Sequence, residues 1–114
     1  MAGELRRLPG PIEFLNLPDG GVARLRIVAW ERGSVVIRQP RPEPAAEKEI
    51  PILRVHLAHG VKPYPPLYWN LSSKTLAAQL LPFLERPRFE HYEYVVTKYG
   101  VAPKARYTVE RVPL

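Results

Sequence analysis

The chain has no cysteine, which removes disulfide bonds, thiolate metal ligands and thiol nucleophiles together. No apolar run approaches the roughly 18 residues that a membrane-spanning helix needs. The paired Arg6 and Arg7 near the N-terminus are followed by no apolar stretch, so they do not form the start of a secretory signal. We therefore expect a cytoplasmic protein without a membrane partner.

Motifs of the common catalytic sites are also missing, among them a Gly-rich phosphate loop, a Gly-x-Ser-x-Gly elbow and a His-Glu-x-x-His pair. His56 and His59 are three apart on an expected strand, so their side chains face opposite ways and cannot share a metal without distortion. A helix cap accounts for Ser72 and Ser73. We expect no catalysis, metal or cofactor. One alternative stays open, a small nuclease in which His56 and Arg54 act on phosphate without metal.

Arginine and proline are what the chain has in excess. Its 114 residues include 12 Arg, 5 Lys and 14 Pro, with a formal net charge of +6. Proline restricts the unfolded chain and suits a thermophile, although a GC-rich genome gives the same bias. A basic surface attracts polyanions over about a Debye length, so the charge favours a nucleic-acid partner.

Length and a hydrophobic content of 46% predict a single domain with a small core. The first 21 residues are rich in Pro and Gly and form an N-terminal arm, and residues 22–112 form the body. Residues 40–49 are polar and proline-rich, which predicts an exposed loop. Three prolines in residues 60–70 predict an extended connector.

Apolar periodicity predicts five strands and one helix. The strands are expected at 22–30, 34–39, 52–58, 89–99 and 105–112. A turn at 31–33 would join the first two strands into a hairpin. The helix is expected to begin at a cap on Asn70 or Ser72 and to kink at Pro82.

The resulting order, β-β-β-α-β-β, resembles that of the OB fold, a five-stranded barrel with a helix between its third and fourth strands. The resemblance is one of element order and surface chemistry, with no sequence motif. It implies an all-β-dominated, OB-like barrel with one helix. An open α+β sheet with one packed helix and an SH3-like barrel with an insert are the alternatives.

Arginine recurs on the expected outer face of the first three strands. Alternation puts Arg24 and Arg26 on one face if Leu25 and Ile27 point into the core. The same reasoning places Arg38 on the outside of the second strand, and Arg54 with His56 on the outside of the third. Like charges on neighbouring strands repel, so this face predicts an anionic ligand. The alternative is neutralisation by glutamates across the barrel.

Aromatic residues accompany these charges, and single-stranded nucleic acid is gripped by a basic groove with rings that stack bases. In an OB fold the ligand also crosses the loops after strands one and four, which adds further cations. The expected nucleic-acid-binding residues are Arg24, Arg26, Trp30, Arg32, Arg38, Arg54, His56, Tyr68, Trp69, Lys98, Tyr99, Lys104 and Arg106.

These observations predict a non-catalytic module that binds single-stranded DNA or RNA with little sequence preference. The alternative from another class is an interaction or assembly module, with a protein partner or as a homodimer. Its contact segment would be Tyr64 to Trp69, because aromatic and proline-rich extended segments suit partner pockets.

Overall fold

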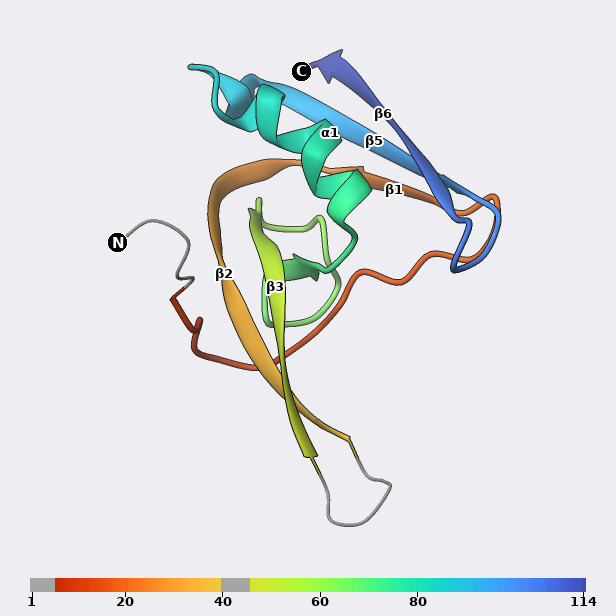
Figure 1. Cartoon of the computed structure of the whole chain (residues 1–114). Helices are drawn as coiled ribbons and strands as arrows, with labels where there is room; N and C mark the ends of the chain where they lie inside the picture. Colours follow the sequence, from red (N-terminus) through yellow and green to blue (C-terminus); the bar gives the residue numbers. More distant parts are fainter. Residues whose placement is uncertain (1–5, 40–45) are drawn as a thin grey trace.

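The computed structural model describes residues 6–39 and 46–114 (Figure 1). Its elements are β1 (Val22–Leu25), β2 (Ile27–Gln39), β3 (Ala46–Leu57), β4 (Tyr68–Leu71), α1 (Lys74–Leu84), a 3-10 turn η1 (Phe89–His91), β5 (Tyr92–Tyr99) and β6 (Arg106–Pro113). The strands form two antiparallel three-stranded sheets, ordered β1-β5-β6 and β2-β3-β4. The expectation of a β-dominated chain with one α-helix is confirmed.

β1 and β2 are two halves of one bent segment, separated only by Arg26. Leu25 pairs with Tyr94 in one sheet, and Ile27 pairs with Leu57 in the other. The expected hairpin between residues 22–30 and 34–39 is therefore wrong. Residues 31–33 lie inside β2 and pair with 52–54 of β3, and the β2–β3 connection falls at 40–45, outside the described residues. Residues 46–49, expected as loop, belong to β3.

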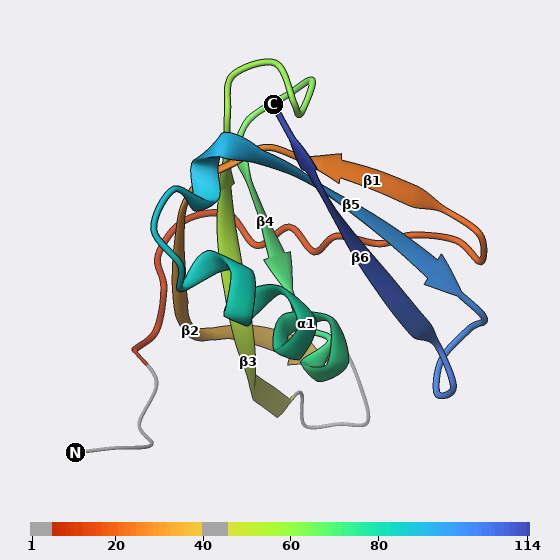
Figure 2. The ribbon, with the colours of Figure 1, turned by 90° about the horizontal axis from the view of Figure 1, so that it is seen from above.

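The described strands do not close a barrel, and the arrangement agrees with the open alternative. Figure 2 shows β1, β5 and β6 on one side of the molecule and β2, β3 and β4 on the other. β4 has only four residues, and its outer edge is already bonded to the arm. The Leu15 N–H donates to the Asn70 carbonyl at 3.1 Å, and the Asn70 N–H donates to the Glu13 carbonyl at 2.9 Å. That edge is not free to pair with β6.

The main core lies between the two sheets and α1. Leu53, Val55 and Leu57 of β3 are buried in it, as strand alternation predicts. α1 adds the buried Leu76, Leu80 and Leu84. The Ser73 hydroxyl caps the helix by accepting from the Leu76 N–H at 3.2 Å, one residue beyond the expected cap, and Pro82 lies within the helix. None of the helices in the described residues has both the length and the apolarity to cross a membrane.

The other face of β2, β3 and β4 is covered by residues 6–15, which we call the strap. At one end the Leu8 N–H donates to the Ser34 carbonyl at the edge of β2, and at the other end the strap bonds to β4. Leu8 is buried against Val35 and Ile52 in a second, smaller core. In Figure 1 this segment is drawn in red and runs across the ribbons of β2 and β3. The arm therefore belongs to the packed body of the protein.

Candidate functional site

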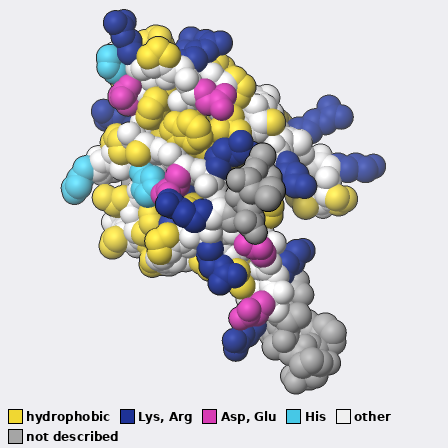
Figure 3. Space-filling model, turned by 60° about the vertical axis from the view of Figure 1, so that its left-hand side comes forward, with side chains coloured by type: hydrophobic (Ala, Val, Ile, Leu, Met, Phe, Trp, Pro, Cys, Tyr) yellow, Lys and Arg dark blue, Asp and Glu magenta, His cyan; other side chains and the backbone are white. Residues whose placement is uncertain are grey.

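The arginines expected to form one basic face are dispersed. Because the chain bends at Arg26, Arg24 belongs to the other sheet, where it forms an ion pair with Glu93 at 3.1 Å. Arg38, far along β2, lies 3.8 Å from Glu47. Arg26 is exposed at the bend, outside both sheets. On the face shown in Figure 3, Lys and Arg side chains are scattered among Asp and Glu. The expected single platform is wrong, and two of its arginines are neutralised by glutamates.

Arg54 points away from the main core, as alternation predicts, but it is buried rather than open to solvent. Only 2% of its surface is exposed, because the strap covers it. Its Nε donates to Asn70 Oδ1 at 2.8 Å and its Nη1 to the Pro9 carbonyl at 2.6 Å. The guanidinium also lies 4.1 Å from the centre of the Tyr68 ring. Arg54 therefore fastens the strap to β3 and β4 in this structure.

His56 lies beside Glu31 on the same face, with its Nε2 2.8 Å from Glu31 Oε2. The hydrogen bond from His56 lowers the pKa of Glu31 below its usual value, aided by the positive charges of Arg54 and Arg6 and opposed by partial burial. The His56 ring also meets Tyr68 edge-on, with 5.5 Å between ring centres. His56 is thus engaged within the protein.

Three of the four expected stacking rings have partners of their own. A bulge between Ile27 and Ala29 reverses the alternation, so Ala29 is exposed and Trp30 turns towards the core. The Tyr68 hydroxyl donates to the Pro11 carbonyl at 2.6 Å. Trp69 packs against the core. The fourth ring, Tyr99 at the end of β5, is 51% exposed.

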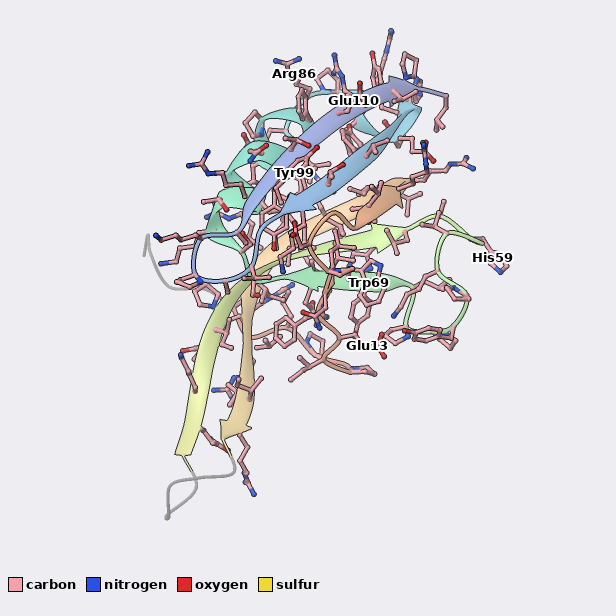
Figure 4. All side chains as sticks on the ribbon, turned by 90° about the vertical axis from the view of Figure 1, so that its right-hand side faces the viewer. Glu13, His59, Trp69, Arg86, Tyr99 and Glu110 are labelled. Atoms are coloured by element: carbon pink, nitrogen blue, oxygen red, sulfur yellow. The ribbon has the colours of Figure 1, made fainter. Side chains whose placement is uncertain are left out.

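A buried lysine in the connector escaped the sequence analysis. Lys62 has a fully buried side chain that pairs with Glu13 and donates to the Pro66 carbonyl at 2.7 Å. Its ammonium lies 4.2 Å from the centre of the Trp69 ring and 4.7 Å from that of Tyr64. Figure 4 shows Glu13 and Trp69 close together at this point. A lone lysine among prolines and aromatic residues is the sequence signal that could have found it.

A groove about 280 Å³ in volume runs along the N-terminal part of α1, and we call it the α1 groove. Arg32 of β2 and Lys74 of α1 supply its charge. Its lining residues are Arg32, Pro51, Ile52, Leu53, Leu71, Ser72, Ser73, Lys74, Ala77, Ala78 and Leu81. A second hollow shares Leu71, Ser72 and Ser73 with it and adds Lys98 of β5 and Tyr107 of β6. The two hollows therefore adjoin at these three residues.

This surface carries positive charge without a matching carboxylate. Neither hollow is lined by Asp or Glu, and within the described part of the chain Arg32, Lys74 and Lys98 make no ion pair. The first turn of α1 has no acidic residue, so the positive end of the helix dipole adds to the charge. Two of the expected residues, Arg32 and Lys98, thus line these adjoining hollows, one in each.

The remaining expected residues lie apart from the α1 groove. Lys98 pairs with Tyr107 across the β5–β6 ladder, whereas Tyr99 pairs with Arg106 on the opposite face of that hairpin. Lys104 is exposed in the turn between these strands. Within residues 6–39 and 46–114, no group of three His, Asp or Glu side chains is placed to hold a metal ion.

The chain matches no protein-family model, no curated protein and no solved structure.

Proposed function

We propose that the protein is a non-catalytic module that binds single-stranded nucleic acid, DNA or RNA, with little sequence preference. The observation that carries the proposal is the α1 groove and the hollow that continues it. Three cations from three elements, Arg32, Lys74 and Lys98, line this surface, and no carboxylate of the described residues does. Binding an anion relieves the mutual repulsion of such cations. Arg24 and Arg38 are already paired with glutamates, so an anion would stabilise them less.

The chemistry of the groove suits a flexible polyanion. Single strands are held by a positive groove that follows the phosphates and by surfaces on which bases rest. Here Leu53, Leu71 and Leu81 provide an apolar floor, and Tyr107 lies beside Lys98. Contacts to phosphates carry no sequence information, so little preference between sequences is expected.

We also propose that the chain is an open form of the OB arrangement. The bent β1–β2 segment pairs with both β3 and β5, and α1 falls between β4 and β5. If β1–β2 is counted as one strand, this gives five strands with the helix between the third and fourth. An OB fold is a partly open Greek-key barrel that binds oligonucleotides. The support for this part of the proposal is topological alone.

The proposal is tested by fluorescence anisotropy with labelled oligo-dT and oligo-U. The triple variant Arg32→Ala, Lys74→Ala, Lys98→Ala should bind at least about tenfold more weakly, because it loses three charged contacts. A control variant replaces Arg24, Arg38 and Arg106, three exposed arginines outside the groove, and loses the same charge. It should stay within about threefold of the natural chain. Equal losses in both variants would contradict binding through the groove.

The second candidate function is a protein-interaction module, and exposed apolar side chains in the proline-rich connector favour it. Tyr64 is 50% and Leu67 36% exposed, and both line a hollow of about 390 Å³ in the proline-rich connector. Exposed apolar side chains around a hollow suit a protein partner or a second copy of the chain. If Tyr64→Ala with Leu67→Ala abolishes self-association in sedimentation while oligonucleotide affinity stays intact, the connector is an interface of its own. A monomer at all concentrations would count against the homodimer.

A further inference from the structure

Two neighbouring donors beneath the strap have no acceptor among the residues that the structure describes. They are Nη2 of Arg54 and Nδ2 of Asn70, which belong to residues paired across β3 and β4. Arg54 is 2% exposed and Asn70 fully buried. Buried polar groups are nearly always hydrogen-bonded, so two unpaired N–H donors on neighbouring residues indicate that an acceptor binds here.

The strap does not supply that acceptor. Its central residues give one carbonyl, from Pro9, to Nη1 of Arg54, and another, from Pro11, to the Tyr68 hydroxyl. Pro9 and Pro11 have no N–H to donate in return. The middle of the strap therefore contributes only these two hydrogen bonds and leaves the orphan donors unmet.

The strap is fixed chiefly at its two ends. At β2, backbone hydrogen bonds join Ser34 to Arg6 and Leu8, and at β4 they join Asn70 to Glu13 and Leu15. Gly33 permits the close approach at the first end, since a Cβ there would lie 2.5 Å from the Arg6 carbonyl oxygen. The second end is reinforced by the pairing of Glu13 with Lys62. Release of the first end would uncover Arg54.

We infer that the face of β2, β3 and β4 beneath the strap is a second binding surface for a phosphate-bearing strand, and that the strap is displaced when it binds. This surface lies opposite the α1 groove, because Arg32 pairs with Leu53 on the core side while Arg54 pairs with Glu31. The location rests on the orphan donors, and the ligand class rests on the proposed function.

A phosphate matches what lies beneath the strap. Its oxygens can accept from Arg54 Nη2 and Asn70 Nδ2 together, which a single peptide carbonyl in the strap does not do. The Tyr68 ring, released from Pro11, would offer a face to a base. Glu31, the carboxylate that pairs with Arg54 across the ladder, is engaged by His56, which does not belong to the strap. The displaced strap and the bound strand thus compete for the same donors.

The test uses a reversible lock on the strap in the full chain. Arg7 and Ser34 are bridge partners, and the chain has no other cysteine to interfere with the double variant Arg7→Cys, Ser34→Cys. Bridge partners are close enough for a disulfide. The reduced form of the same protein is the matched control. We expect the oxidised form to bind labelled oligo-dT several-fold more weakly than the reduced form.

Hydrogen exchange provides a second readout on the natural chain. The Leu8 amide donates from the first end of the strap to Ser34, so saturating oligo-dT should speed its exchange. Gly33→Ala, which crowds the docked strap, should raise affinity and serves if the disulfide does not form. The inference is overturned if the oxidised and reduced forms bind oligo-dT with equal affinity and the amide exchange is unchanged. If the disulfide does not form, equal affinity of Gly33→Ala and the natural chain, again with unchanged exchange, overturns it. If oligo-dT binding in that case still depends on Arg32 and Lys98, the proposed function holds and only the second binding surface is lost. Absence of binding in every form overturns both.

Discussion

The indole Nε1 of Trp30 donates a 3.1 Å hydrogen bond to the carbonyl oxygen of Leu84, the last residue of α1. The final carbonyls of a helix lack partners within the helix, so this contact satisfies one of them and joins β2 to α1. It also turns the ring inward, which removes Trp30 from any stacking surface.

Replacing Trp30 with Phe should therefore lower stability and spare binding. Loss of one partly buried hydrogen bond and some ring contact should cost about 1–2 kcal/mol in the free energy of unfolding. Urea denaturation measures the change, and Val28→Ala, at an exposed position in the same strand, is the control and should change little. A large drop in oligonucleotide affinity with unchanged stability would mean that Trp30 contacts the ligand.

Glu31 contributes to the free energy of unfolding, and this contribution is lost at acid pH. The hydrogen bond from His56 lowers the pKa of Glu31 below 4.5 in the folded state. A group whose pKa is depressed on folding stabilises the protein above its unfolded pKa. That contribution is present above about pH 4.5 and is lost as pH falls through the folded pKa.

The check is urea unfolding between pH 7 and pH 3 for the natural chain and for His56→Ala. The variant should lose less stability on acidification, because its Glu31 has lost the hydrogen bond that lowers its pKa. NMR titration of the Glu31 carboxyl follows the same group directly. An unchanged Glu31 titration in His56→Ala would show that the hydrogen bond does not set this pKa.

Lys62 should matter far more to stability than an exposed lysine. Lys62→Ala removes a fully buried side chain and leaves Glu13 without its cation, which should cost about 3 kcal/mol or more. Lys74→Ala is the matched control, since Lys74 is exposed and should change stability by less than about 0.5 kcal/mol. Similar denaturation midpoints for the two variants would contradict the role given to Lys62.

Local patterns in the sequence predicted the core side of the fold well. Leu53, Val55 and Leu57 alternate with polar residues and are buried as expected. The leucines of residues 76–84 follow a helical repeat and form the buried face of α1. In each case the signal lies within a few neighbouring residues, so one sequence is enough to read it.

The candidate site was less accessible to prediction because it depends on distant contacts. The bend at Arg26 and the bulge at Val28 leave no clear mark in composition, yet they decide where Arg24 and Trp30 point. Gly33 suggested a turn, but it lies within β2. The strap passes so close that a side chain at this position would collide with it. Arg32 and Lys74 line one groove although they lie far apart in the sequence. Such relationships appear once the chain is folded.

The salt dependence of oligonucleotide binding tests the central claim most directly. If Arg32, Lys74 and Lys98 neutralise three phosphates, log affinity for oligo-dT should fall with log salt at a slope near −2. The slope should become clearly shallower in the groove triple variant and stay near −2 in the Arg24, Arg38, Arg106 control. A flat response in the natural chain, or the full slope in the groove variant, would contradict binding of a polyanion in the α1 groove.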